Sequence, residues 1–338
     1  MQFRHWILVL CFINLTVRAD SPQQFANIGG LLLTSGETLH DCKVGFRTAG
    51  KLNSDKSNVI VFPTWFTGTS GNLLEYELIG PGKLADTDRY YVIAIDALAN
   101  GISTSPSNST TQAGAKFPAI SIDDMVHSQY LLLTRHLGFD HVMAVMGISM
   151  GGMQTFQWMG QYADFMDKAV PIDGSPRMTS YDLLQWQTHA TAIELMQEAG
   201  ISNAKIVEFL SLANLLTLWT PDYFVENVTP EALPEYLTTA VEAYAQMDAY
   251  NYLSQLQAMM EHDVYADHAG DEQSYEKKVE AAVLVMGVAS DHMVNPAPGK
   301  ALSASIAAPY SNINSNCGHM GTTCEAAEVS ERVNAFLK

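Results

Sequence analysis

Short apolar runs rich in valine and isoleucine recur along the chain and alternate with stretches whose apolar residues follow helical spacing. The runs lack polar alternation, which is typical of strands buried on both faces of a parallel sheet. They span residues 58–66, 90–98, 141–149, 168–173 and 281–291. Between two of them, residues 121–138 begin with a capping-box-like pair, Ser121 and Asp124, and stop at Gly138, which predicts a helix. Strands that alternate with helices predict an α/β fold with a mostly parallel, doubly wound sheet.

The pattern changes on either side of these runs. Residues 27–52 combine apolar stretches with polar turns, which favours antiparallel strands. Helical spacing with few strand signals dominates residues 180–200, 203–219 and 230–263. We therefore expect a helical cap over 176–275, inserted between the sixth and seventh strands of a core formed by 20–175 and 276–338.

The first residues differ from the rest of the chain. "MQFRHW" supplies a basic start, "ILVLCFINLTV" is a short apolar run, and "VRA" ends in a small residue. This is the pattern of a secretory signal peptide over residues 1–19, cut after Ala19, and it predicts a periplasmic or secreted protein. A short membrane anchor or a buried N-terminal strand is the alternative. No later segment is long and apolar enough to predict a membrane span.

Composition narrows the possible partners. The 338 residues are 47% hydrophobic and only 16% charged, with a formal net charge of −18. This length is ample for a full core, as expected of a soluble enzyme. An acidic surface repels phosphate backbones, so we do not expect a nucleic-acid partner.

Export changes the interpretation of the cysteines. Cys42, Cys317 and Cys324 remain once the signal is removed, and an oxidising compartment permits a disulfide. Cys317 and Cys324 flank "GHMGTT" and could close a small ring, although three free thiols are the alternative. No cysteine cluster has metal-ligand spacing, so we expect neither a structural zinc nor another metal site, and no cofactor.

The segment "GISMG", residues 147–151, contains the candidate nucleophile Ser149. An apolar strand precedes it and a helical pattern follows, as a nucleophile elbow requires. Glycines beside the serine avoid clashes at the sharp bend, and the helix start adds a positive dipole near a developing oxyanion. A flexible turn of small residues is the alternative.

A serine hydroxyl needs a base, and the base needs an acid to orient it. His319 follows the last predicted strand, 310–315, and Asp291 ends the strand before it. The chain order Ser149, Asp291, His319 is that of α/β-hydrolase triads. Asp173, after another strand, is the rival acid, and His292 is expected to support the site from beside Asp291. Ordinary core or surface roles are expected for His127, His136 and His141.

An oxyanion hole should complete the site. One donor should be the backbone N–H of Met150, directly after the nucleophile. The second should come from "PTWFTGTSGN", through the N–H of Phe66 or of its neighbour Trp65. The two rings either pack in the core or line an acyl pocket.

Several long blocks resemble the homoserine O-acetyltransferase family of the α/β-hydrolases. They include residues 78–109, "FPAISIDDMVHSQYLLLTRHLG" and "MGISMGGMQTFQW", and the likeness extends from about residue 40 to 185. The resemblance implies an acyl-serine intermediate on Ser149, with Asp291 and His319 completing the triad. It also implies a helical cap over the cleft and a homodimer.

Two departures from that family concern the acceptor. Those transferases carry an aspartate directly after the catalytic histidine, where this chain has Met320. They also carry an arginine in the cap, and "TLWT" at 217–220 places Trp219 there. Without these charges the site loses the means to bind an amino-acid zwitterion. We therefore expect a more apolar substrate pocket formed by Trp65, Trp219 and Met320.

Together these features predict an exported serine hydrolase that acts on small esters, such as acetyl esters. Acetyl-CoA is a cytosolic metabolite, so water is the abundant acceptor outside the cell. An O-acyltransferase that uses another hydroxyl acceptor is the second hypothesis. A catalytically silent binding protein on the same fold is the third.

Overall fold

The structure, a computed structural model, describes residues 21–266 and 270–338. The predicted signal peptide and its expected cleavage site after Ala19 therefore lie outside the described residues. The strands are β1 (Gln24–Leu32), β2 (Thr38–Ala49), β3 (Val59–Pro63), β4 (Ile79–Gly80), β5 (Ala85–Asp86), β6 (Tyr91–Ile95), β7 (Val142–Ile148), β8 (Met166–Ile172), β9 (Ala282–Val283), β10 (Val285–Val288) and β11 (Tyr310–Ile313).

One sheet of nine strands organises the molecule. Its order is β1-β2-β6-β3-β7-β8-β10-β11, and β9 pairs with β8 beside β10. The strands from β6 to β11 are parallel, whereas β1–β2 and β2–β6 are antiparallel. This confirms the predicted α/β fold with a mostly parallel sheet, and also the antiparallel strands expected over 27–52.

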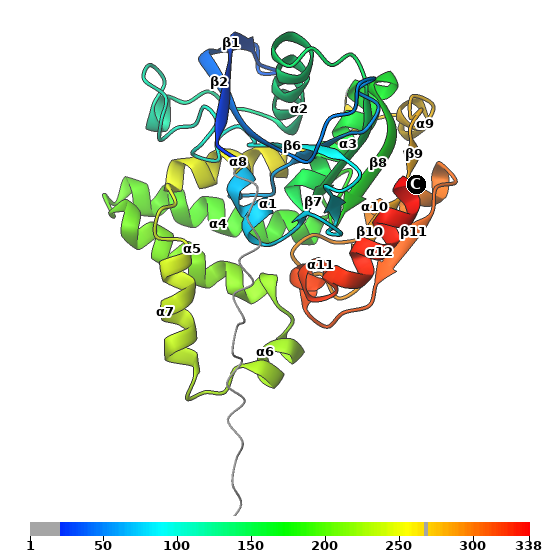
Figure 1. The fold of residues 1–338 in the computed structure, drawn as a ribbon. Helices are drawn as coiled ribbons and strands as arrows, with labels where there is room; N and C mark the ends of the chain where they lie inside the picture. Colours follow the sequence, from blue (N-terminus) through cyan, green and yellow to red (C-terminus); the bar gives the residue numbers. More distant parts are fainter. Residues whose placement is uncertain (1–20, 267–269) are drawn as a thin grey trace, which may run out of the picture.

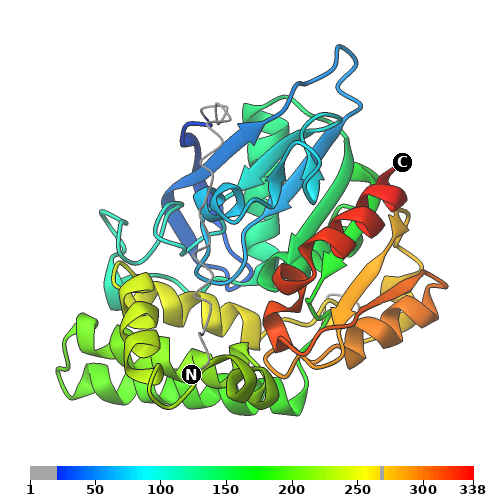
Figure 2. The same cartoon turned by 60° about the horizontal axis from the view of Figure 1, so that its bottom comes forward.

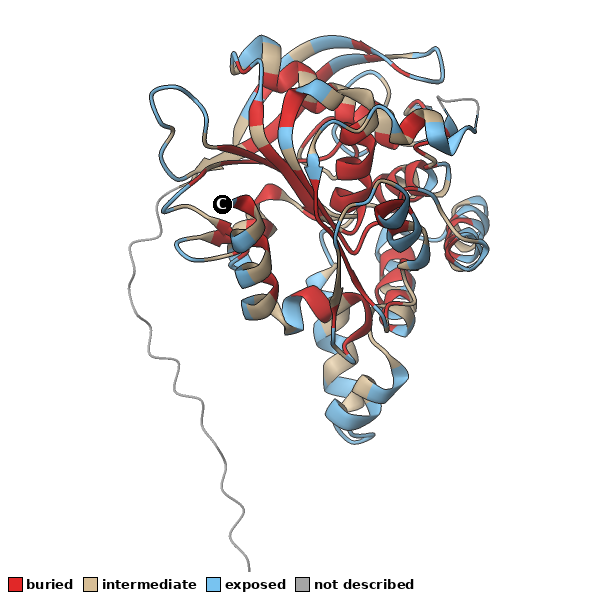
Figure 3. Ribbon diagram, turned by 90° about the vertical axis from the view of Figure 1, so that its right-hand side faces the viewer, coloured by how far each residue is buried: buried red, intermediate tan, exposed pale blue. Residues whose placement is uncertain are grey.

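Helices cover both faces of the sheet (Figure 1). Those of the core are α1 (Ser70–Glu75), α2 (Ile122–Leu131), α3 (Met150–Gln161), α9 (Glu272–Glu276), α10 (Ala297–Ser305), α11 (Gly321–Cys324) and α12 (Ala326–Leu337). In β3, Val59 and Val61 face a cluster that includes residues of α2 and α3. Ile60 and Phe62 face the opposite cluster, which includes residues of α1 and α12. The central strands of the sheet, such as β3 and β10, are consequently buried on both sides, as Figure 3 shows.

The helix predicted over 121–138 forms with a modified end. Ser121 and Asp124 make the expected capping box at the start of α2. After α2 the chain continues as one π-helical turn, Leu132–His136, which the apolar spacing did not reveal. Gly138 then ends the segment with a φ of 68°, a left-handed conformation that glycine adopts readily.

A group of helices lies between β8 and β9 and gathers at one end of the sheet (Figures 1 and 2). They are α4 (Ser180–Glu198), α5 (Asn203–Leu218), α6 (Pro221–Asn227), α7 (Leu233–Ala243) and α8 (Ala249–Met260). We call α4–α8 the cap. The later residues Val264, Tyr265 and Tyr275 pack with the sheet in its main core cluster. Among the described residues, no helix combines the length and apolarity needed to cross a membrane.

Candidate active site

Ser149 occupies the sharp bend between β7 and α3. Its φ of 58° and ψ of −122° are unusual for a residue with a side chain. The bend brings backbone segments close together, and its glycines permit this. A Cβ atom on Gly147 would lie 2.3 Å from the carbonyl oxygen of Gly151, and one on Gly151 would lie 2.6 Å from that of Pro63. The segment therefore has the geometry of a nucleophile elbow.

The structure brings Ser149, His319 and Asp291 together in one hydrogen-bonded chain. His319 Nε2 lies 2.8 Å from Ser149 Oγ, and its Nδ1 lies 2.6 Å from Asp291 Oδ2. Because a carboxylate only accepts, Nδ1 carries the proton and Nε2 is left to accept that of the serine. Asp291 Oδ1 accepts from the N–H groups of Met293 and Val294, which fixes the carboxylate. This arrangement can deprotonate the serine hydroxyl.

The electrostatic surroundings of His319 favour its protonated form. Burial by itself would lower the pKa of the imidazole. The negative charge of Asp291 and its hydrogen bond outweigh burial, and Asp173 and Asp182 add to them. The pKa of His319 is therefore raised above its usual value, as suits an imidazole that must accept a proton during a reaction.

Asp173, the rival acid, has a different role. Its Oδ1 accepts from the N–H of Val288, 3.0 Å away, and its Oδ2 accepts from the hydroxyl of Thr322. Val288 ends the strand before Asp291, and Thr322 lies just beyond His319, so Asp173 ties both segments together. Burial, followed by the charge of Asp291, raises the pKa of Asp173 to about 7. Both oxygens of Asp173 are thus bonded to other groups, and the carboxylate that hydrogen-bonds the imidazole is that of Asp291.

The other histidines considered from the sequence lie elsewhere. His292 Nε2 lies 3.2 Å from the carbonyl of Leu216, so this side chain connects the acid segment to the cap. The remaining three make ordinary structural contacts: His127 with Tyr162, His136 with Phe46, and His141 with Asp167.

Backbone donors suited to an oxyanion lie beside Ser149. The N–H of Met150 is at the first position of α3, where a helix offers it no acceptor. Trp65 to Gly68 form a turn closed by the Gly68 N–H, while the Thr67 N–H donates to Gln255 Oε1. Among the described residues, neither the Trp65 N–H nor the Phe66 N–H has a protein acceptor. Both remain available as the second donor beside Met150, so the predicted pair of Met150 and Phe66 stays a prediction.

A cavity of about 240 Å³ opens onto Ser149 and His319. Its walls are largely aromatic and aliphatic, and no Asp, Glu, Lys or Arg of the described residues lines it. Trp65 and Met320 line it, as predicted, and so does Phe66, whose ring was left open between the core and the pocket. Trp219 does not, because it follows the last residue of α5 and stacks on Tyr223 with ring centroids 4.4 Å apart. Leu218, one residue earlier, faces the cavity instead.

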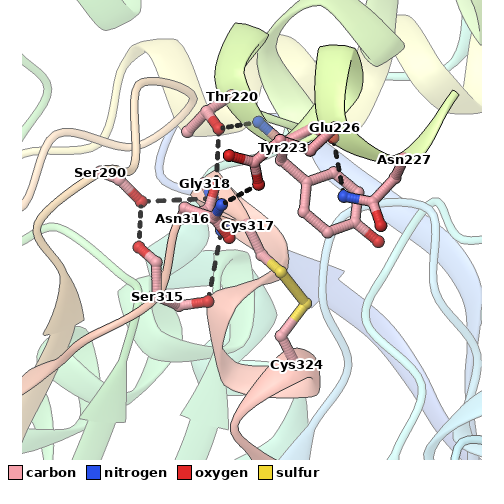
Figure 4. Close-up of a disulfide and its surroundings, with 10 residues drawn as sticks. All are labelled: Thr220, Tyr223, Glu226, Asn227, Ser290, Ser315, Asn316, Cys317, Gly318 and Cys324. Carbon is pink, nitrogen blue, oxygen red and sulfur yellow. Dashed lines mark hydrogen bonds between the residues drawn. A yellow bond between two sulfur atoms is a disulfide. The ribbon is translucent and has the colours of Figure 1, made fainter.

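The segment that carries His319 is held by a disulfide and by the cap (Figure 4). Cys317 and Cys324 are bonded, while Cys42 is a free, buried cysteine. Thr220 donates to the carbonyl of Asn316, whose side chain donates to Glu226 of α6. The disulfide considered from the sequence therefore forms, in a loop that the cap also contacts.

Sequence reasoning missed several cavity residues contributed by the cap. Asn214 of α5 and Tyr252 of α8 line the cavity and hydrogen-bond each other at 3.0 Å. No motif marked them, because a helical pattern does not show which turn faces a site formed by another part of the chain. Within residues 21–266 and 270–338, no group of three His, Cys, Asp or Glu residues could hold a metal ion.

Comparison with known proteins supports this reading of the fold. The alpha/beta hydrolase fold family matches residues 58–321. An ethyl acetate hydrolase from Pseudomonas veronii is 31% identical over 95% of this chain and 96% of that protein. A homoserine O-acetyltransferase from Geotalea daltonii is 38% identical, over 44% of each chain.

A solved structure gives the same assignment. An acetylester hydrolase from Corynebacterium glutamicum superposes with a TM-score of 0.86 and 26% identity, covering 94% of this chain and 96% of that one. The sheet order, the elbow and these similarities agree. The chain belongs to the α/β-hydrolase fold family and is an esterase-like member of it.

Proposed function

We propose that this protein is an exported serine esterase that hydrolyses small neutral esters through an acyl intermediate on Ser149. The observation that carries the proposal is the hydrogen-bonded chain from Ser149 through His319 to Asp291. It opens into a cavity that no Asp, Glu, Lys or Arg of the described residues lines. The signal-like residues 1–19 support export.

The proposed reaction has two steps. Ser149 Oγ attacks the ester carbonyl while its proton moves to His319 Nε2, and the N–H groups of Met150 and Phe66 stabilise the oxyanion. The C–O bond to the alcohol breaks, and the alcohol leaves with the proton from His319. Water then attacks the acyl-serine, giving its proton to His319, and collapse releases the acid as Ser149 recovers its proton.

The cavity supports a small, uncharged substrate. An ammonium or carboxylate group would lose its hydration without gaining a charged partner, which is unfavourable in an apolar site. Met320 lines the cavity beside His319 and offers no charge. The names of the Pseudomonas veronii and Corynebacterium glutamicum relatives agree with short acyl esters.

Hydrolysis of p-nitrophenyl acetate and labelling by a fluorophosphonate test the proposal. We expect Ser149→Ala and His319→Gln to lose activity by roughly 10⁴-fold or more, with no label on the alanine variant. His127→Gln, a change of the same kind outside the cavity, should keep both. Labelling that persists in Ser149→Ala would contradict the assignment.

An O-acyltransferase is the second candidate, and the similarity to homoserine O-acetyltransferases favours it. An acyl-serine attacked by an alcohol instead of water would give a new ester. Adding homoserine or a simple alcohol to the assay should then shift product from acid to ester. Acid as the sole product at all acceptor concentrations would leave hydrolysis as the function.

A further inference from the structure

Three cap helices meet in a buried chain of polar side chains beside the cavity. The hydroxyl of Tyr252, on α8, donates to Asn214 Oδ1 on α5 at 3.0 Å. His189 Nδ1, on α4, lies 3.0 Å from the same hydroxyl oxygen. Asn214 and His189 are each 8% exposed and Tyr252 only 1%, so water cannot readily replace these bonds. With the Tyr252 hydroxyl donating to Asn214, His189 Nδ1 carries a proton and donates to that hydroxyl, and the two bonds together orient the Asn214 amide.

The other half of that amide has no partner within the described residues. Because Oδ1 faces Tyr252, the Nδ2 group points the other way. Among the described residues, Asn214 Nδ2 donates to no acceptor. Nδ2 is also absent from the fully buried polar atoms that lack a partner, so part of it is accessible. Asn214 lines the cavity of Ser149, so its free N–H groups open into that cavity.

A fixed donor in a largely apolar cavity discriminates between ligands. Leaving it unpaired after an apolar ligand has displaced water costs about 1–3 kcal/mol, whereas a ligand oxygen at the same place satisfies it. The neighbouring wall is apolar, since the ring of Tyr252 packs edge-on against Phe66 with centroids 4.5 Å apart. The donor therefore selects for one additional acceptor atom on an otherwise apolar ligand.

We propose that Asn214 Nδ2 recognises a second acceptor oxygen of the substrate, separate from the ester that is cleaved. The preferred substrates are then small neutral esters that also carry an ether, keto or second ester oxygen. This inference rests on the proposed esterase function. It leaves open which side of the ester carries the oxygen, and the experiment separates the two.

Two pairs of isosteric esters provide the test. In the acyl arm, p-nitrophenyl methoxyacetate is compared with p-nitrophenyl butyrate, and in the alcohol arm 2-methoxyethyl acetate is compared with butyl acetate. Each pair exchanges one ether oxygen, an acceptor without a proton, for a methylene group. For each pair we take the ratio of kcat/KM for the ether ester to kcat/KM for its methylene analogue. Comparing this ratio between wild type and Asn214→Leu cancels the intrinsic reactivity of the esters.

We expect Asn214→Leu to lower that ratio roughly tenfold in one arm, the effect of one hydrogen bond of about 1.4 kcal/mol. Tyr252→Phe, which frees the amide to rotate, should lower the same ratio by a smaller factor while butyrate hydrolysis persists. Asn227→Leu, the same change on the exposed side of α6, should leave both ratios unchanged. Melting temperatures verify that the variants fold.

Two outcomes would overturn the inference in distinguishable ways. Ratios within twofold of wild type in both arms, for Asn214→Leu and Tyr252→Phe alike, would show that the amide does not contact substrate, while esterase activity stands. A wild-type protein that hydrolyses none of the four esters would contradict the esterase function itself, and this inference with it.

Discussion

Ser149 combines a strained backbone with a precise set of neighbours. Its left-handed φ is unfavourable for a residue with a Cβ and persists because the bend is packed from both sides. The strain places Oγ at the edge of the sheet, within 2.8 Å of His319 Nε2. Substituting Gly147 or Gly151 would force the backbone apart and displace Oγ before any chemistry begins.

The two buried aspartates allow a matched test at the residue scale. Asp291→Asn removes the charge that stabilises the imidazolium and can leave the ring in the wrong tautomer, so we expect kcat to fall by about 10³- to 10⁴-fold. Asp173→Asn keeps an acceptor for the Val288 N–H and should lower kcat far less. Steady-state ester kinetics of both variants check this. Equal losses would contradict the assignment of Asp291 as the acid partner of His319.

The pH profile of ester hydrolysis reports the state of His319. Only its neutral form accepts the serine proton, and the site raises its pKa. We expect kcat/KM to rise with pH along a limb whose midpoint lies above about 6.5, the usual histidine value. In Asp291→Asn the charge that raises the His319 pKa is gone, so the midpoint of the rising limb should move to lower pH. An unchanged midpoint in the variant would contradict the proposed coupling.

The choice between Asp291 and Asp173 marks a limit of sequence reasoning. Each follows a buried strand, and α/β sheets place both strand ends at the same edge, so periodicity could not separate them. Which aspartate acts as the acid is decided by their hydrogen-bond partners, His319 for Asp291 and Thr322 for Asp173, which lie in a later segment of the chain. The prediction for Trp219 was wrong for a related reason. At the end of α5 a shift of one position decides which side chain faces the cavity, and Leu218 faces it where Trp219 was expected.

At the scale of elements, the segment carrying His319 depends on several parts of the molecule. Ser290, in the acid segment, donates to the carbonyl of Ser315 and accepts from the Gly318 N–H (Figure 4). Thr220 holds Asn316 from the cap. The strands, the capped helix and the elbow could be predicted because their signals are local. The contacts of this junction could not be predicted, because they join three regions that lie far apart in the sequence and no local pattern marks them.

The Cys317–Cys324 disulfide should stabilise this junction. It closes a short loop with a sequence separation of 7, and removing such a cross-link costs about 2–3 kcal/mol in a loop-entropy estimate. We expect the double variant Cys317→Ser, Cys324→Ser to unfold at a lower urea concentration. Its kcat should fall while its KM changes little, since the ring contains His319.

Reductant provides the control for the disulfide prediction. Dithiothreitol should move the urea midpoint of wild type toward that of the double serine variant and leave the variant itself unchanged. Cys42 is present in both proteins and cancels from the comparison. A wild-type midpoint that ignores reductant, with thiol titration showing that the bond was broken, would contradict a stabilising role.

At the scale of the whole molecule, buried ionisable groups decide how stability varies with pH. His262 is 5% exposed, its Nε2 has no hydrogen-bond partner in the part of the chain that the structure describes, and burial lowers its pKa to about 3. Asp173 acts in the opposite sense, because burial raises its pKa to about 7. Acidification from neutral pH therefore favours the folded state through Asp173 and the unfolded state through His262.

The substitution His262→Asn isolates one of these two contributions. Below about pH 6.5 the unfolded chain protonates His262, whereas the folded protein keeps it neutral until about pH 3, so its contribution to stability is lost as pH falls through that window. Asparagine can still donate one hydrogen bond but does not titrate. Between pH 8 and 4.5 we expect wild type to lose about 2–3 kcal/mol more unfolding free energy than the variant. Urea unfolding at both pH values measures this, and the contribution of Asp173 cancels because both proteins keep it. Parallel losses would mean that His262 gains access to water or a proton before the protein unfolds.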